Sequence, residues 1–226
     1  MKEETSIKNF NDYLYNQLSH YHQLIRNIFN SYWKLYKAGE KPNEENLLNL
    51  FYTPRQSFIK FCKSNNLNYS SVAGTIQEWT LFHFLNAGLS FYKKDSIAQV
   101  INRFQIPFKW KKKGNKKINL DVVINNNRTN IIYYAFEIKT NFEDGFYKYL
   151  SEENIIYHLR QRTYPYFKYY YISLTKPTKS IERKYKRKVN TLIKRKELYV
   201  LNKNRCIYPG IKEFIKSISK AIIKIK

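Results

Sequence analysis

Acidic residues, glycine, proline, cysteine and methionine are all scarce in this chain of 226 residues. Cys62 and Cys206 lie far apart without a Cys-x-x-Cys neighbour, which argues against a disulfide framework and against a zinc site. The four histidines form no HExxH pattern, so a zinc hydrolase is not indicated either. With 6 glycines and neither a GxxxxGKS/T nor a GxGxxG loop, the sequence predicts no nucleotide hydrolysis and no nucleotide cofactor.

Long apolar runs are absent as well. No stretch of about eighteen apolar residues is present, so we expect no membrane-spanning helix and no membrane partner. The opening residues, MKEETSIK, lack the apolar core of a signal peptide. These two absences together predict a cytoplasmic protein.

Lysine and arginine, in contrast, number 41 against 17 acidic residues, a formal net charge of +24. Such an excess favours a polyanionic partner. Part of it reflects an A- and T-rich coding sequence, since Asn, Ile, Lys and Tyr are all heavily used. Two stretches, 109–117 and 176–196, concentrate the charge, and a solvated helix surface is the alternative explanation for the second. The candidate contacts to a nucleic acid within them are Lys111, Lys112, Lys113, Lys116, Lys184 and Arg187.

The length is sufficient for one sizeable core, which we divide into a helical N-terminal region, 1–69, and a core region, 70–226. β-Branched and aromatic runs predict strands, and apolar residues at spacings of three and four predict helices. Their order predicts a mixed α/β fold in which helices flank a central mixed sheet. The expected strands are 96–108, 118–124, 131–139, 167–174 and 197–201, and the expected helices are 5–37, 44–51, 55–63, 70–88, 151–162 and 211–226.

The most specific signal is the placement of Asp121, Glu137 and Lys139 on two neighbouring strands. Residues two apart on a strand share a face, so Glu137 and Lys139 point the same way. Two carboxylates and an ammonium on one face are the groups needed to hold a hard divalent cation and to activate water against a phosphodiester. The alternative is a structural ion pair in which Glu137 and Lys139 neutralise each other at the rim of the sheet.

The pairing of the two strands depends on the turn between them. A three-residue turn over 128–130 sets Asp121 opposite Glu137, and directly opposed side chains lie close together. A wider turn over 125–130 instead sets Asp121 opposite Tyr134. The sequence is compatible with both turns.

An acidic residue followed, on the next strand, by an acid-x-Lys triplet resembles the motif of the PD-(D/E)XK nucleases. Asp121 takes the first position and Glu137, Ile138 and Lys139 form the triplet, although Leu120 stands where the family has proline. The resemblance implies that Asp121, Glu137 and the backbone carbonyl of Ile138 ligate Mg²⁺, and Mn²⁺ also suits such oxygen ligands. It implies that Lys139 orients or helps to deprotonate the attacking water and stabilises negative charge on the phosphate.

Glu78, on the helix expected over 70–88, is a further candidate for a catalytic role. It is similar to the helical glutamate that helps to position a metal or its water in many restriction enzymes of this family. An ordinary surface glutamate is an equally good explanation.

Side chains after the triplet supply further candidate contacts to DNA. Arg160, Gln161 and Arg162 end the helix expected over 151–162 and have long donors suited to bases or phosphates. Basic residues favoured by the helix dipole are the simpler explanation for any one of them. The tyrosines around Pro165 are candidates for stacking on bases, although sheet packing explains most aromatic residues.

The resemblance implies a type II restriction endonuclease, which is a Mg²⁺-dependent homodimer that cuts double-stranded DNA at a palindromic site, here expected to be AT-rich, in the bacterial cytoplasm. The region 1–69 would then serve in dimerisation or embrace the DNA. Two alternatives remain open. One is a repair or junction-resolving nuclease of the same family, and the other is a non-catalytic basic protein that binds nucleic acid.

Overall fold

A computed structural model describes residues 23–27, 30–31, 34, 44–66, 69–110, 114–129, 131–151, 168–202 and 207–226. For residues 44, 46, 70–72, 107–110 and 114–117 it describes the backbone alone. The helix expected over 5–37 therefore lies largely outside the described residues, as does nearly all of the one expected over 151–162.

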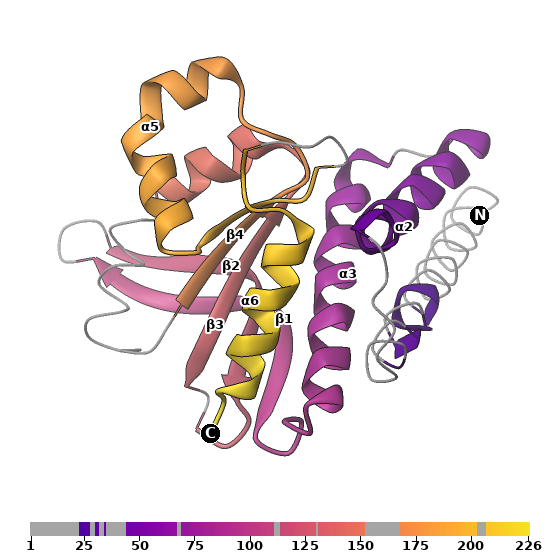
Figure 1. Cartoon of the computed structure of the whole chain (residues 1–226), viewed down its shortest axis with the longest axis vertical. Coiled ribbons are helices and arrows are strands. Elements are labelled where there is room, and N and C mark those ends of the chain that lie inside the picture. Colours follow the sequence, from indigo (N-terminus) through magenta and orange to yellow (C-terminus); the bar gives the residue numbers. More distant parts are fainter. Residues whose placement is uncertain are drawn as a thin grey trace, which may run out of the picture.

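Five strands form one sheet in chain order: β1 (Ala98–Trp110), β2 (Gly114–Asn126), β3 (Ile132–Lys139), β4 (Lys168–Ser173) and β5 (Leu198–Val200). The first three strands are antiparallel neighbours, whereas β3, β4 and β5 are parallel neighbours. This mixed sheet with flanking helices confirms the predicted α/β fold (Figure 1).

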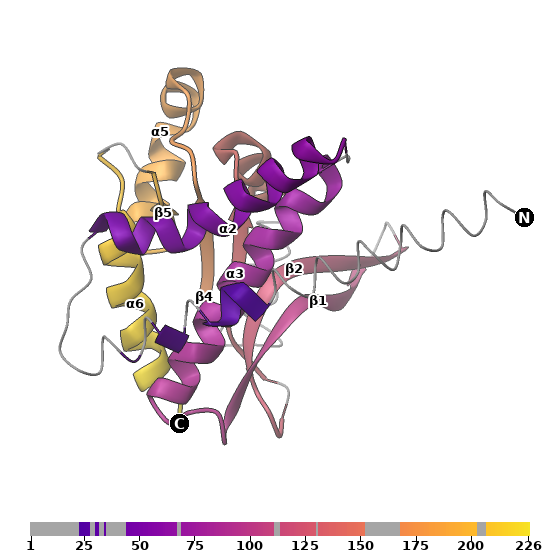
Figure 2. The same ribbon diagram turned by 90° about the vertical axis from the view of Figure 1, so that its right-hand side faces the viewer.

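Helices cover both faces of the sheet (Figures 1 and 2): α2 (Glu44–Ser64), α3 (Ser70–Phe91) and α6 (Ile211–Ile223) on one face, and α5 (Lys179–Lys194) and a helix over 142–151 on the other. Each face has its own core because side chains alternate along a strand. Phe136 and Tyr170 belong to the first core, and Ala135 and Tyr171 belong to the second. Within the described ranges, no helix is long and apolar enough to cross a membrane.

Helix α2 is continuous where the sequence predicted two helices separated near Pro54. Phe51 and Phe58 flank the proline at helical spacing and are buried in the first core. This packing outweighs the loss of the backbone hydrogen bond that proline cannot donate. The Tyr52 hydroxyl lies 2.7 Å from the carbonyl oxygen of Leu174, which ties α2 to the end of β4.

Helix α3 begins at Ser70, as expected, but its predicted end at Gly88 is wrong because it continues to Phe91. Leu89 is buried, so the apolar face of the helix extends beyond the glycine. The extended helix packs along β1 and the first core.

The described residues of the basic stretch, 109–110 and 114–117, belong to the long hairpin of β1 and β2. Strand β1 continues to Trp110, and β2 begins at Gly114 directly opposite it. Lys116 pairs with Phe108 in this register. These described residues therefore lie near the end of the hairpin at which β1 stops and β2 starts.

A helix occupies 142–151, where the sequence predicted no helix before Ser151. Phe142, Phe146 and Tyr149 recur at spacings of four and three and are buried in the second core. Their burial outweighs the low helix propensity of Gly145. This helix brings additional side chains to the end of β3.

Candidate active site

The strands β2 and β3 pair in the register that places Asp121 beside Glu137. Val122 lies opposite Phe136 and Ile124 opposite Tyr134, as the predicted pairing requires. The turn itself is not the predicted one, because the backbone N–H of Asn126 donates to the carbonyl of Ile131. A bulge after Ile124 then shifts the pairing by one residue and restores the predicted register.

The sheet divides just beyond Val122. Paired residues of β2 and β3 end at Val122 and Phe136, whereas β2 remains paired with β1 as far as Gly114. At the division, Oδ2 of Asp121 accepts a hydrogen bond of 3.0 Å from the backbone N–H of Ile138. At this point the carboxylate of Asp121, in place of a backbone carbonyl of β2, accepts the hydrogen bond from β3. The bond holds Asp121 against the triplet Glu137, Ile138 and Lys139.

Four charged side chains meet at this division, and we call them the ion-pair cluster: Asp121, Glu137, Lys139 and Lys148. The ammonium of Lys139 lies 2.7 Å from Oδ2 of Asp121 and 2.9 Å from Oε1 of Glu137. The ammonium of Lys148 lies 2.6 Å from Oε1 of Glu137 and 3.9 Å from Oδ1 of Asp121. Two positive charges therefore balance two negative charges.

The two carboxylates are buried, whereas the two ammoniums are partly exposed. Glu137 has 0% and Asp121 7% of its surface exposed. Oε2 of Glu137 has no hydrogen-bond partner among the described residues. Burial raises the pKa of Glu137 to about 7, Asp121 adds to this, and Lys139 and Lys148 partly oppose it. Burial alone would lower the pKa of Lys139, but the Glu137 and Asp121 carboxylates raise it above its ordinary value.

Lys148 reaches the cluster because the helix over 142–151 packs unusually close to the strands at Gly145. A Cβ atom added there would lie 2.6 Å from the ring of Tyr171 and 2.7 Å from Cγ of Lys139. The Tyr171 hydroxyl also donates to the carbonyl of Phe142 at 2.5 Å, which anchors the start of the helix. Sequence reasoning missed Lys148, and its signal is the spacing of Gly145 and Lys148, about one helical turn apart.

Glu78 does not join the ion-pair cluster. Its carboxylate forms an ion pair of 3.0 Å with Arg103 of β1. Its neighbour Gln77 is buried and accepts a hydrogen bond of 2.9 Å from the Thr140 hydroxyl, just after the triplet. On a helix, adjacent residues point about 100° apart, so Gln77 is the residue of α3 that reaches the end of β3.

The cluster offers few but suitable ligands for a hard cation. Among the described residues, no three Asp, Glu, His or Cys side chains form a group that would enclose a metal. Asp121 and Glu137 nevertheless supply two carboxylates, and the unpartnered Oε2 of Glu137 is a buried oxygen without a donor. Mg²⁺ commonly binds through one or two carboxylates and keeps several waters. The residues present therefore fit Mg²⁺ or Mn²⁺, with the Ile138 carbonyl as a further oxygen.

Several predicted DNA contacts fall outside the described residues, namely Lys111, Lys112, Lys113, Arg160, Gln161 and Arg162. Only the backbone of Lys116 is described, in β2. Lys184 and Arg187 lie on the exposed face of α5, whose opposite face buries Ile181, Val189 and Leu192. Both side chains are therefore on a solvated face, and their contact with DNA stays a prediction.

Three of the tyrosines considered for base stacking are core residues. Tyr169, Tyr170 and Tyr171 are each at most 1% exposed and pack within β4. Alternation along the strand directs Tyr170 into the first core and the other two into the second. In this conformation none of the three presents a ring face to a nucleic acid.

The chain has no counterpart in the comparisons with known proteins. No protein-family model, curated protein or solved structure matches it. The arrangement of its own side chains is accordingly the basis for inferring what it does.

Proposed function

We propose that this chain is a Mg²⁺-dependent endonuclease of the PD-(D/E)XK type that hydrolyses double-stranded DNA at a specific, palindromic and AT-rich site. The single observation that supports this most is the meeting of Asp121, Glu137 and Lys139 where β2 and β3 separate, with one buried carboxylate oxygen unpartnered. A net charge of +24 suits a DNA partner.

Each side chain of the cluster has a role in this proposal. Asp121 and Glu137 would hold the metal together with the Ile138 carbonyl. A bound Mg²⁺ would supply a Lewis acid that polarises the phosphate and lowers the pKa of water. Lys139, held as an ammonium between the carboxylates, would orient water and stabilise negative charge on the phosphate. Lys148 would act as a positioning residue, because it engages Oε1 of Glu137 and leaves Oε2 available.

A type II restriction enzyme acting as a homodimer is the form of this activity that we favour. Two-fold symmetry of the protein matches two-fold symmetry of the DNA, and each subunit then cuts one strand. Size-exclusion chromatography with light scattering would test the dimer directly.

A second candidate function rests on the charge balance of the cluster. Two ammoniums already neutralise two carboxylates, so the network needs no ion to be tolerated in its buried position. In that case the protein would be a basic nucleic-acid-binding protein without catalytic activity.

Incubation of the purified protein with a long linear duplex, in Mg²⁺ or in EDTA, separates these possibilities. Discrete fragments that appear only with Mg²⁺ support the restriction enzyme. Selective cutting of branched DNA indicates a junction-resolving or repair nuclease, and retention without cutting indicates the binding protein.

Variants of the cluster test the assignment of its residues. Asp121→Ala and Lys139→Ala should reduce cutting by about 100-fold or more, whereas Lys194→Ala, which removes an exposed charge at the end of α5, should not. Folding of each variant is checked by circular dichroism. Normal cleavage by a folded Asp121→Ala protein would show that the site is elsewhere.

A further inference from the structure

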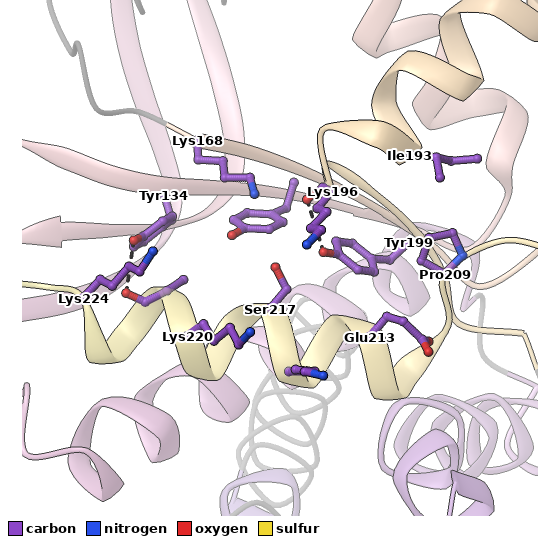
Figure 3. A pocket seen from close by; sticks show the side chains of 13 residues that line it. Tyr134, Lys168, Ile193, Lys196, Tyr199, Pro209, Glu213, Ser217, Lys220 and Lys224 are labelled. Carbon is purple, nitrogen blue, oxygen red and sulfur yellow. Dashed lines mark hydrogen bonds between the residues drawn. The ribbon is translucent and has the colours of Figure 1, made fainter.

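A second charged site lies on the other face of the sheet from the ion-pair cluster. A cavity of about 650 Å³ opens between α6 and the beginnings of β4 and β5 (Figure 3). Five lysines line it, and we call it the lysine pocket: Lys168, Lys196, Lys216, Lys220 and Lys224. Cavities of roughly 300–1,000 Å³ are typical of sites for small molecules.

Four of the five lysines of the pocket have no carboxylate partner among the described residues. Lys216 and Lys220 on α6 and Lys224 at its C-cap recur every four residues, so they form one stripe of like charge. In the part of the chain that the structure describes, none of these three forms an ion pair with a carboxylate, and neither does Lys196. Such a stripe is self-repulsive unless an anion lies against it.

Glu213 is the one acidic side chain that lines the pocket, and it is already engaged. Its Oε2 accepts a hydrogen bond of 3.0 Å from the backbone N–H of Gly210 and so caps the start of α6. Five ammoniums against one engaged carboxylate leave the lining with an excess of four positive charges.

The floor of the pocket supplies neutral hydroxyls. Tyr170 and Tyr199 are buried side by side, with ring centroids 6.1 Å apart. Burial raises the pKa of both tyrosines, and a hydrogen bond with Ser217 partly opposes this, so both hydroxyls keep their protons at neutral pH. Figure 3 shows Ser217 directed from α6 toward the strands, with Lys168 and Lys196 facing it from the other side. Hydroxyls within a ring of ammoniums suit phosphate oxygens.

We propose that the lysine pocket binds a compact ligand carrying several phosphate groups, of the oligophosphate class. The limited volume of the pocket favours such a ligand over an extended nucleic-acid backbone. The site is independent of the proposed endonuclease activity, because the strand residues that line it, Tyr134, Tyr170 and Tyr199, face the first core, whereas the ion-pair cluster lies on the face of the second core.

Titration calorimetry of the full chain with inorganic tripolyphosphate, in buffer without Mg²⁺, tests the proposal. We expect one site per chain and at least tenfold weaker binding by the double variant Lys216→Ala/Lys220→Ala. The control is Lys176→Ala/Lys194→Ala, which removes the same charge from exposed positions outside the pocket. Binding by the control should stay within twofold of wild type.

Three outcomes would overturn the proposal: no tripolyphosphate binding by wild type, equal weakening in both double variants, or selective weakening of duplex DNA binding in the pocket variant. The last would make the pocket part of the path of DNA. A parallel titration with adenosine triphosphate distinguishes two sources of the phosphates. Tighter binding than tripolyphosphate supports a nucleotide that also contacts the tyrosine floor, and equal binding supports an inorganic chain.

Discussion

The ion-pair cluster and the lysine pocket use lysine in opposite ways. In the cluster, Lys139 and Lys148 are matched one to one by buried carboxylates. In the pocket, lysines surround a cavity whose one acidic side chain is engaged by its own helix. Matched charges hold side chains in a defined geometry, as chemistry requires, whereas unmatched charges attract an anion from solution. The net charge of the whole chain therefore predicts neither the matched charges of the cluster nor the unmatched charges of the pocket.

The largest effect that separates the two sites is expected from one lysine in each. Lys139→Ala should reduce DNA cleavage by about 100- to 1000-fold, the usual range for removing a group that stabilises transition-state charge. Lys220→Ala should leave cleavage within about twofold, because the pocket lies on the other face of the sheet. Single-turnover cleavage at saturating enzyme measures both. Equal losses of cleavage in the two variants would mean that the cluster and the pocket are not separate sites and that both lysines act on the same ligand.

The next largest effect is on stability and comes from Gly145. In Gly145→Ala the new methyl would overlap Tyr171 and the Lys139 side chain, so we expect destabilisation by about 1–3 kcal/mol. Gly74→Ala is the matched control, because an added Cβ there meets nothing within 4 Å in helix α3. That variant should be more stable by about 0.5–1 kcal/mol.

Urea denaturation of both glycine variants gives these free energies of unfolding. If the helix over 142–151 is what positions Lys148, Gly145→Ala should also weaken cleavage while tripolyphosphate binding is retained. A Gly145→Ala protein as stable as wild type would contradict the close packing of this helix on β3 and β4.

The alternation of side chains along a strand made the positions of Glu137 and Lys139 predictable from the sequence. Alternation along β3 placed Glu137 and Lys139 on one face, and β-strand pairing brought Asp121 to them. The register was predicted from a three-residue turn that does not exist, and a bulge near Ile124 produces the same pairing. A bulge of this kind depends on the packing of the whole hairpin, which sequence pattern alone does not contain.

The remaining site residues could not be predicted because they depend on contacts between segments that are distant in the sequence. Glu78 was a candidate because a helical glutamate suits a metal, but Arg103, 25 residues away, engages Glu78. Lys148 was missed because no helix was predicted before Ser151, and only burial in the second core reveals the helix over 142–151. The lysine pocket joins the beginnings of two strands to α6, so no local motif marks it.

Burial of Glu137 also makes the stability of the protein depend on pH at the ion-pair cluster. In the metal-free protein the pKa of Glu137 is raised from 4.5 to about 7, chiefly by burial. The folded protein thus holds this proton more tightly than the unfolded chain does. The resulting stability is complete below about pH 4.5 and is lost as pH rises through about 7.

The comparison of wild type with Glu137→Gln isolates this effect, because glutamine does not titrate. Melting temperatures in EDTA between about pH 5 and pH 8 should decline for wild type relative to the variant. Parallel curves would indicate that the Glu137 carboxylate is ionised throughout this range and that Lys139 and Lys148 outweigh its burial.

The smallest expected effect concerns the repulsion within the lysine pocket. Lys220 is exposed and has a lysine four residues before it and another four residues after it, so Lys220→Glu replaces two repulsive pairs on α6 with two attractive ones. We expect a gain in stability of about 0.2–0.5 kcal/mol for each pair at low ionic strength. Because the pairs are exposed, about 1 M salt should remove most of the gain. Urea denaturation at both salt concentrations measures it. A gain that persists in high salt would point to packing. A loss of stability at low salt would mean that groups of the protein itself already neutralise the stripe. The contrast between a matched cluster and an unmatched pocket would then no longer hold.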